Sequence, residues 1–430
     1  MRWLMGMALR NVLRNKRRSA LTMLTVLLGT ALLTLGLSWL NGLMGMIFGG
    51  ATDMAGEVRV VTEAYAKRQA TLPLYENVDP VEPLIETIQE VHPTARVHPT
   101  IKTAVTLTVG EDIGDHFGLL VAAEEAYFRD VLELSEGIEQ GAYFSGGAKE
   151  ALLGRALAAQ IDAKVGDDLV VLGQTQDGSP SPLKLRVQGV VNGGNSLADR
   201  QVFVPFSEGQ WLADFDSGAT EVLVYGGGYM EAADVASALR KSSVFRAYES
   251  ERMAECRARE VSEDICRFRV EAWSEREPYS GIYTTVTAVF AVLAVIIVFV
   301  TALGVLNTMI MSVMERSAEI GVLRAMGLRK RGVVGMFVME GVLIGLVGAG
   351  LGLVLGMVPS VLLEVHGIHL GEGLTSKTGF PLSTTVHADF TWAIAGLSAA
   401  LGILTALLGS LLPAVRASAI EPVNAMRRRR

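Results

Sequence analysis

The stretch MERSAEIGVLRAMGLRKRGVV, Met314 to Val334, is a short charged segment between two of the most apolar parts of the chain. Its charged residues are Glu315, Arg316, Glu319, Arg324, Arg329, Lys330 and Arg331. The flanking windows, 282–314 and 333–363, contain one charged residue between them, Glu340. Each window exceeds the roughly 20 helical residues that cross a hydrocarbon core of about 30 Å. The sequence therefore predicts two transmembrane helices joined by a polar loop at 315–332.

Two further windows, 20–48 and 390–412, are also long and apolar enough to span a membrane. Half of the 430 residues are hydrophobic, which favours a membrane protein. The first window follows a basic start, as in a cleaved secretory signal, but its apolar run is about twice as long as that of a signal. Because three more spans follow, we expect four transmembrane helices.

The distribution of Lys and Arg predicts which side of the membrane each segment faces. Segments 1–19, 315–332 and 413–430 together contain 16 basic and 3 acidic residues, whereas 49–281 contains 21 basic and 38 acidic residues. Cytoplasmic flanks of spans keep an excess of Lys and Arg. We therefore expect a basic N-terminal helix at 1–19, the 315–332 loop and a basic tail at 413–430 in the cytoplasm. Segments 49–281 and 364–389 are expected outside.

Segment 49–281, with about 230 residues, is large enough to fold as a domain. Alternating apolar residues predict strands at 56–61 and 103–109, and helical spacing predicts a helix at 78–91. This mixture indicates an α+β fold. We expect two lobes, with the outer one inserted at about 126–218.

The only two cysteines, Cys256 and Cys266, both lie in this exterior segment. An oxidising compartment permits a disulfide, but sequence separation does not fix the distance between Cα atoms, so a bonded pair and two free thiols both stay open. With six histidines in the chain and no further cysteine, the sequence gives little support for a metal site.

The sequence lacks the short motifs of common catalytic sites. It contains no G-x-x-x-x-G-K-[ST] phosphate loop, no H-E-x-x-H and no G-x-S-x-G. No predicted cytoplasmic segment is long enough to form a nucleotide-binding domain. We therefore expect no enzymatic activity and no cofactor on this chain, and an energy source on a separate protein.

In the 315–332 loop, Ile320, Leu323 and Met326 recur at three-residue steps and put an apolar strip on one face of a helix. Such a helix cannot bury this face within its own small loop, so a groove on a partner protein is one expected destination. The alternative is a helix on the lipid surface, with Arg329 to Arg331 near the headgroups. Spacing alone does not separate the two.

The loop resembles the coupling helix of ABC transporter permeases of the MacB/LolC/FtsX type, which share the pattern E-[KR]-x-x-[ED]-I-[GA]-[IV]-L-[RK]-x-[LM]-G. The matching residues are Glu315, Arg316, Glu319, Ile320, Gly321, Leu323, Arg324, Met326 and Gly327. The segments ALRNVLRNKRRSALT (8–22) and LPAVRASAIEPVNAMR (412–427) also resemble this type. VEAWSEREPYSGIYT (270–284) resembles the segment before the second span in LolC-like members.

The resemblance implies a MacB-like periplasmic core domain at 49–281 and a dimer of permeases, identical or sister chains, in a bacterial inner membrane. A cytoplasmic ATPase dimer that binds ATP and Mg²⁺ would dock on the loop, and no nucleic acid partner is expected. The resemblance is closest to LolC/LolE-like permeases, which implies extraction of lipoproteins, or other amphiphilic substrates, for hand-over to a periplasmic carrier. The alternatives are a MacB-type efflux permease and an FtsX-type regulator of a cell-wall hydrolase.

On this interpretation, substrate and membrane lipids would meet the outer ends of the first two spans. The candidate substrate-facing residues are Leu40, Met44, Ile47, Phe48, Tyr283, Val286 and Phe290. In the third span, glycines between Gly341 and Gly356 recur at three- or four-residue steps and are expected to pack helices closely within one subunit. Glu340 is expected to form an ion pair near the cytoplasmic interface.

Overall fold

The computed structural model describes residues 6, 10, 14, 16–110, 116–147, 149–193, 197–369 and 385–419. The chain divides into two compact units. The helical unit comprises residues 1–44, 284–369 and 385–430, and the sheet unit comprises 45–283 and 370–384. The expected basic tail beyond residue 419 and most of the expected loop at 364–389 lie outside the described residues.

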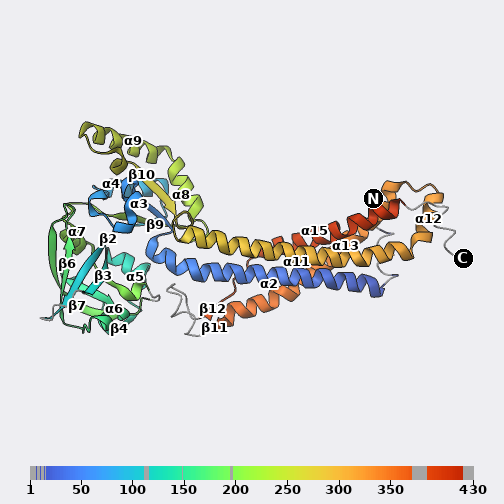
Figure 1. Ribbon diagram of the computed structural model, residues 1–430, viewed down its shortest axis with the longest axis horizontal. Helices are drawn as coiled ribbons and strands as arrows, with labels where there is room; N and C mark the ends of the chain where they lie inside the picture. The colour runs from blue at the N-terminus through green and yellow to red at the C-terminus, as the bar shows by residue number, and fades with distance from the viewer. Residues whose placement is uncertain are drawn as a thin grey trace. The chain divides into compact units, whose positions relative to one another are not determined.

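Four helices are long and apolar enough to cross a membrane, as the sequence predicts. They are α2 (Lys16–Ala55), α11 (Tyr279–Glu315), α13 (Lys330–His366) and α15 (Trp392–Ser418), and a short helix, α12 (Ser317–Ala325), lies between α11 and α13 (Figure 1). α2 continues past the predicted end of its span at 48, because helical hydrogen bonding does not stop where the hydrocarbon ends.

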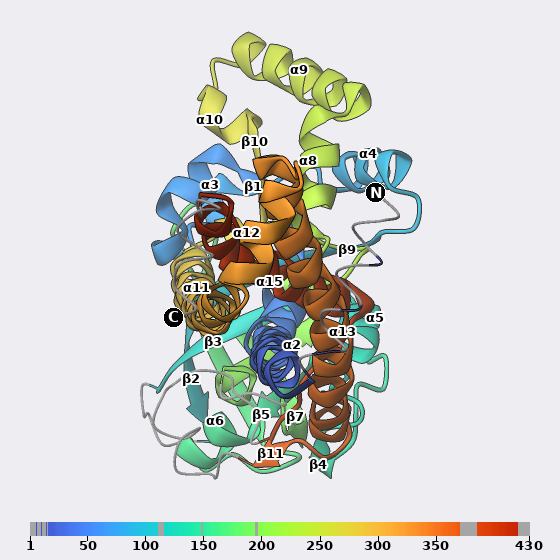
Figure 2. The same cartoon turned by 90° about the vertical axis from the view of Figure 1, so that its right-hand side faces the viewer.

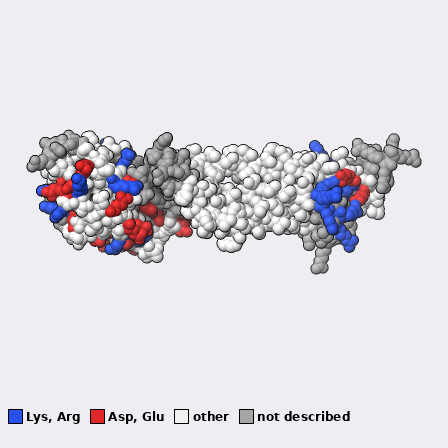
Figure 3. Space-filling view, turned by 90° about the horizontal axis from the view of Figure 1, so that it is seen from below, with Lys and Arg blue, Asp and Glu red and all other residues white. Residues whose placement is uncertain are grey.

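Charged side chains of the helical unit gather at the α12 end, and the middle of the bundle shows an uncharged surface (Figure 3). The residues at the α12 end include Arg18, Glu315, Arg324 and Arg329. A charge in the middle of a bilayer is costly, so an uncharged band next to a charged end is the pattern that a membrane requires.

Glycines on one face of α13 let it approach both α2 and α15. A Cβ atom built on Gly356 would lie 2.7 Å from the carbonyl oxygen of Ala31 in α2, and one built on Gly345 would lie 2.9 Å from the Cβ of Ala406 in α15. Both distances are shorter than the 3.5–4.0 Å at which packed carbon atoms are most favourable. The expectation that this face packs within one subunit is therefore confirmed.

Replacing Gly356 by Ala is expected to destabilise the fold by about 1–3 kcal/mol, because the backbone of α2 must move to admit the methyl group. Gly350, on the same helix, has nothing within 4 Å of a built Cβ, so Gly350→Ala is the matched control and is expected to be neutral or slightly stabilising. Thermal unfolding of the full chain in nanodiscs measures both. Equal melting temperatures would contradict a close contact between α2 and α13.

The sheet unit contains a ten-stranded sheet. Its strands are β1 (Val58–Thr62), β2 (Arg96–Val109), β3 (His116–Ala123), β4 (Ile138–Gly141), β5 (Glu150–Gly154), β6 (Asp168–Gln174), β7 (Pro180–Val191), β8 (Gln201–Pro205), β9 (Glu221–Tyr225) and β10 (Phe268–Ala272). The order is β10-β1-β9-β2-β3-β8-β5-β7-β4, and β6 pairs with both β2 and β7. The predicted strands at 56–61 and 103–109 correspond to β1 and the second half of β2.

Six of these strands close into a barrel. β2 pairs with β3, β3 with β8, β8 with β5, β5 with β7, β7 with β6, and β6 pairs back to the end of β2. Apolar side chains from these strands form one buried cluster, which includes Ile101, Leu120, Leu153 and Val202. Closure pairs the backbone groups that a sheet edge would leave exposed.

The outer lobe is larger than the sequence predicts. The expected insertion at about 126–218 omits β2 and β3, which supply two of the six barrel strands. The first half of β2 pairs with β9 in the inner part of the sheet, and its second half pairs with β6 in the barrel. One strand therefore belongs to both lobes. A single-sequence pattern shows that β2 is a strand but not where its hydrogen-bond partner changes.

Helices lie beside both parts of the sheet (Figures 1 and 2). They are α3 (Glu63–Arg68), α4 (Glu82–Val91), α5 (Glu125–Asp130), α6 (Arg155–Gln160), α7 (Phe206–Ala213), α8 (Ala232–Lys241), α9 (Ser243–Ala258) and α10 (Glu263–Cys266). α4 lies within the predicted helix at 78–91. In the helical unit, β11 (Ile368–His369) pairs with β12 (Thr385–Val386).

Candidate functional site

The loop between α11 and α13 folds into a compact corner around α12. α12 begins at Ser317, directly after Arg316, and the chain turns at Gly327, whose φ of +98° costs glycine little. Arg329 then precedes the first turn of α13. The corner brings α12 against the ends of three membrane-spanning helices.

Ile320 anchors α12 inside this corner. Its side chain is 1% exposed and belongs to a buried cluster with residues of α11, α13 and α15. The other buried members are Val313, Val333, Met336, Phe337, Ala414 and Ala417. The expectation that Ile320, Leu323 and Met326 form one outward strip is therefore wrong. The ends of three spans converge at the loop, so α12 buries one of its faces within its own subunit.

Val322 and Met326 form the outward surface of α12. Val322 is 47% exposed and Met326 is 71% exposed, and their four-residue spacing places them on the same side of a helix. Leu323 is half-buried between the two faces. Sequence reasoning missed Val322, because the three-residue steps from Ile320 select the neighbouring Leu323 instead.

The nine residues of the loop motif divide by burial. Arg316, Ile320 and Gly321 are buried, Leu323 and Arg324 are half-buried, and Glu315, Glu319, Met326 and Gly327 are exposed. The motif thus combines an inward anchor with an outward surface.

Arg316 connects α12 to α13 through a buried ion pair. Its Nη1 lies 3.2 Å from Oε2 of Glu340, and its Nε lies 3.4 Å from Oε2 of Glu319. The guanidinium also lies over the ring of Phe337, 5.6 Å from the ring centroid. The expected ion pair of Glu340 near the interface is thus made with Arg316. Removing either buried charge would leave the other unpaired, so the pair fixes the loop to α13.

Two more ion pairs tie the N-terminal segment to the loop. Arg14 pairs with Glu319, and Arg18 pairs with Glu315. Burial acts to raise the pKa of Glu319, but the hydrogen bond from Arg14 and the charges of Arg14 and Arg316 outweigh it, so the pKa is lowered. Because these carboxylates are exposed, the pairs orient the segment and add little stability.

Replacing Arg316 by Met is expected to destabilise the chain by about 3–5 kcal/mol, because the buried Glu340 carboxylate loses its partner. Adding Glu340→Gln is expected to restore part of this loss. Arg331 is exposed, so Arg331→Met serves as the control and should change little. The measurement is thermal unfolding of the full chain in nanodiscs. Equal stability of the Arg316 and Arg331 variants would count against the ion pair.

At its other end, α2 terminates among hydrogen-bond donors of the sheet unit. A helix leaves its last four carbonyl groups without helical partners. The hydroxyls of Tyr127 and Tyr225 donate to the carbonyl oxygen of Asp53, at 3.0 and 2.7 Å. Lys102 Nζ donates to the carbonyl oxygen of Met54 at 3.1 Å. A cation at the C-terminus of a helix also interacts favourably with its dipole.

Arg276 completes this cap from the segment that leads into α11. Its guanidinium donates to the carbonyl oxygen of Ala55 and, at 2.6 Å, to that of Gly56. Burial lowers the pKa of Arg276 to about 10, and the nearby charge of Arg59 acts in the same direction. Since α11 begins at Tyr279, Arg276 links the end of the first span to the start of the second.

Glu221 supplies the negative charge for this buried group of cations. Its carboxylate lies 2.9 Å from Lys102 Nζ and 3.2 Å from Arg59 Nη1. Burial acts to raise the pKa of Glu221, but the charges of Lys102 and Arg59 outweigh it and lower the pKa to about 2. Sequence reasoning missed the whole group, because its members are far apart in the chain and each resembles an ordinary strand residue.

The lowered pKa of Glu221 predicts a pH-dependent contribution to stability. A carboxylate whose pKa is lower in the folded state stabilises the fold above its ordinary pKa of 4.5, and this contribution is lost as the pH falls towards 2. We therefore expect the melting temperature of the native chain to exceed that of the Glu221→Gln variant, and the difference to be largest near neutral pH. The difference should shrink between about pH 4.5 and pH 2. A difference that does not change with pH would contradict the charged state assigned to Glu221.

The candidate substrate-facing residues fall in both units. Ile47, Phe48 and Tyr283 belong to the sheet unit, and Leu40, Met44, Val286 and Phe290 belong to the helical unit. Phe48 is fully buried, with its ring centroid 4.3 Å from that of Trp273 and 6.1 Å from that of Tyr283. Met44 is also buried. Phe48 and Met44 thus pack within the chain, and the substrate-facing role of all seven residues stays a prediction.

Cys256, in the last turn of α9, and Cys266, at the end of α10, are paired as a disulfide, with their Cα atoms 6.4 Å apart. The bond closes the short connection between these two helices. Among the described residues, no group of three or more His, Cys, Asp or Glu side chains is arranged to hold a metal ion.

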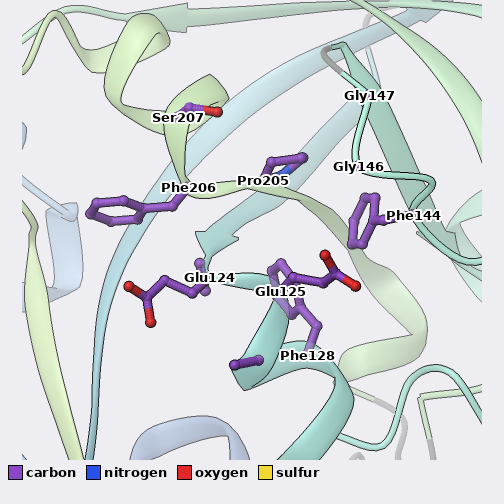
Figure 4. A pocket seen from close by; sticks show the side chains of 11 residues that line it. Glu124, Glu125, Phe128, Phe144, Gly146, Gly147, Pro205, Phe206 and Ser207 are labelled. Carbon is purple, nitrogen blue, oxygen red and sulfur yellow. The ribbon is translucent and has the colours of Figure 1, made fainter.

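A pocket of about 570 Å³ opens where the parallel strands β3 and β8 end. Figure 4 shows the rings of Phe144 and Phe206 on opposite sides, with Glu125 between them. The acids that line the pocket already have cationic neighbours or a histidine beside them. Glu125 lies 3.8 Å from Arg129, and Glu124 lies 3.6 Å from Nδ1 of His98. We therefore assign this pocket no ligand.

Comparison with known families covers both units. A family of FtsX-like permease C-terminal domains matches residues 291–422. A family of MacB-like periplasmic core domains matches residues 19–241, which is more than half of the chain. The chain belongs to the MacB/FtsX family of ABC transporter permeases. The sheet unit of this permease is its extracytoplasmic domain, inserted between the first and second of four long apolar helices. Permease subunits lack catalytic activity, as expected from the sequence.

Curated relatives share about a third of the permease. An uncharacterized ABC transporter permease of Methanocaldococcus jannaschii is 32% identical over 128 residues, which is 30% of this chain and 29% of the relative. The macrolide export ATP-binding/permease protein MacB of Salmonella typhi is 34% identical over 132 residues, which is 30% of this chain and 17% of the relative. MacB of Brucella abortus is 28% identical over 153 residues, which is 36% of this chain and 21% of the relative. The alignments thus span less than a third of these relatives.

Among solved structures, the extracellular domain of the noncanonic ABC-type transporter YknZ from Gram-positive bacteria is similar to this chain. The sequences are 15% identical, the match covers 50% of this chain and 98% of that one, and the TM-score is 0.32. Taken together, the comparisons confirm the MacB/FtsX type expected from the sequence. They do not show the expected closeness to LolC/LolE-like permeases, since the named relatives are MacB proteins.

Proposed function

We propose that this permease converts ATP-driven closure of a separate cytoplasmic ATPase dimer into movement of its extracytoplasmic domain. Two permease chains, identical or sister, would sit on the ATPase dimer, which would bind the ATP and Mg²⁺. The observation that carries the proposal is the division of α12 into two faces. Arg316 and Ile320 hold it to its own subunit, while Val322 and Met326 are exposed. A helix anchored on one face and apolar on the other is suited to a partner groove.

Two uninterrupted helices would carry movement from α12 to the domain. α11 runs from Tyr279 to Glu315 and α2 from Lys16 to Ala55, and neither contains proline, the commonest cause of a kink. Arg18 joins α2 to the end of α11 at the loop. In physical terms, nucleotide would shift the populations of two arrangements of the same helices.

We further propose that both termini and α12 lie in the cytoplasm of a bacterium, with the permease in the inner membrane and its domain in the periplasm. The supporting observation is the distribution of charge. The three segments assigned to the cytoplasm contain 16 basic and 3 acidic residues, and charged side chains gather at the α12 end of the bundle (Figure 3).

As the transport activity, we propose MacB-type efflux of an amphiphilic substrate. Support comes from the MacB-like core domain and from relatives whose name describes macrolide export. The second candidate is lipoprotein release from the membrane to a periplasmic carrier. It is favoured by the LolC-like segment at 270–284, in which Trp273 and Tyr283 pack around Phe48 at the outer end of α2.

Replacing Met326 by Asp is expected to weaken binding of the ATPase at least about tenfold, because docking would bury an unpaired charge. Met326 is 71% exposed, so the melting temperature of the permease should not change. Met230→Asp makes the same chemical change at a residue of the sheet unit that is 68% exposed, and it should bind the ATPase normally. Binding and ATPase stimulation are measured in nanodiscs. Normal stimulation by the Met326 variant would contradict α12 as the docking element.

Proteoliposomes separate the candidate activities. Efflux predicts ATP-dependent movement of a macrolide across the membrane with no carrier present. Lipoprotein release predicts that a radiolabelled lipoprotein leaves the vesicles only with both ATP and a periplasmic carrier. ATPase stimulation with neither movement would instead favour an FtsX-type regulator of a cell-wall hydrolase.

A further inference from the structure

α11 differs from the other three spans in how little of it the chain covers. In the most apolar window of each helix, 6% of α11 is buried, against 39% of α2, α13 and α15. In the end-on view of Figure 2, α11 stands at the side of the bundle. One face of α11 contacts its own subunit: Thr308 Oγ1 lies 3.0 Å from Thr22 Oγ1 of α2, and Val305 lies against Gly409 of α15. The opposite face is uncovered.

The uncovered face carries residues that recur every three or four positions. One such line consists of Val289, Leu293, Ile296, Val300, Leu303, Asn307, Met311 and Met314, all of which are exposed. Val292, Val295 and Phe299 lie beside this line and are exposed as well. With 3.6 residues per turn, each position in the line from Val289 to Met314 lies within about 40° of the mean direction of this set around the helix axis. This spacing is typical of the seam along which two helices pack side by side. We call this set the α11 seam.

Asn307 is the exception in the α11 seam. The other polar residues between 288 and 314 are Thr301, Thr308 and Ser312, and none of them is exposed. No described residue of the chain forms a hydrogen bond with the Asn307 side chain. Asn307 lies eight residues before Glu315, which is about 12 Å along the helix and within the apolar part of the span. Lipid tails offer an amide no hydrogen-bond partner.

We infer that the α11 seam is the contact surface for α11 of a second copy of this chain, with the two Asn307 amides hydrogen-bonded to each other. An amide carries both donors and an acceptor, so it complements its own copy. In a two-fold symmetric pair, residues near the axis meet their counterparts. Lipid tails and a second helix cover the apolar positions equally well. Only a second helix can hydrogen-bond the amide, so the amide makes a second helix the preferred neighbour. The inference rests on the proposed function, since it names the surface between its two permease chains.

The meeting of the two amides also sets the register of the pair. Val300 and Met314 lie seven residues before and after Asn307, so each would face its own counterpart on the second helix. A shift along the axis would separate the amides and return both to lipid. A polar residue in an otherwise apolar seam is known to fix register in this way.

Single introduced cysteines test the contact, because the two native cysteines are paired with each other. Val300→Cys in the full chain, which keeps the Asn307 amide, is oxidised in native membranes without nucleotide and is expected to give a disulfide-linked species of twice the chain mass. Val298→Cys is the matched control, about 3 Å away along the helix and about 160° around it, and should cross-link several-fold less. Equal cross-linking at both positions would overturn the inference. So would a conjugate of any other mass, such as one with a sister chain.

Asn307→Leu tests the amide itself, with cross-linking read at Val300→Cys. Loss of the hydrogen bond is expected to lower the dimer yield about threefold to tenfold, which corresponds to roughly 0.6 to 1.4 kcal/mol. Asn307→Gln keeps an amide and should retain most of the yield. An unchanged yield in Asn307→Leu would overturn the role of the amide. Neither experiment uses nucleotide or ATPase, so its failure is distinct from that of the Met326→Asp experiment.

Discussion

The extracytoplasmic domain depends on how the backbone of α2 is satisfied where the helix ends. In lipid a helix bonds its own carbonyl groups, but its last turn needs donors from elsewhere. Here the donors are the side chains of Lys102, Tyr127, Tyr225 and Arg276. They come from β2, α5, β9 and the segment before α11. The helix end is therefore capped only when the sheet is complete, and the first span and the domain fold stabilise each other.

The cap places several charges away from water, and the fold compensates each with a partner. Glu221 lies between Lys102 and Arg59, and Arg59 also pairs with Glu271. Such buried networks contribute less to net stability than to a single arrangement, because a partly paired network is strongly unfavourable. The loop at the other end of the spans uses the same solution in a smaller form. There the buried pair of Arg316 and Glu340 fixes α12 to α13.

The cap at the end of α2 and the Arg316–Glu340 pair at the loop leave the four spans with different roles. α13 packs closely against α15 and α2 through its glycines, and these three helices are buried to the same extent. α11 touches this bundle along one face only, yet it connects the end of the extracytoplasmic domain to the loop. A helix that is both a connector and largely uncovered is suited to change its neighbours while the rest of the bundle keeps its packing. This is the physical basis of the two arrangements that we propose for the permease.

The sequence by itself determined the spans, the polar loop, the α+β domain and the close-packed glycine face, because each follows from the length or period of a local apolar pattern. The sequence also contained the loop motif and the basic residues that flank the spans. Only the tertiary structure decided that Ile320 faces inward, that Glu340 pairs with Arg316, that six strands close a barrel, and which four donors cap α2. Each of these depends on residues distant in sequence, and a local pattern does not record which distant group comes near.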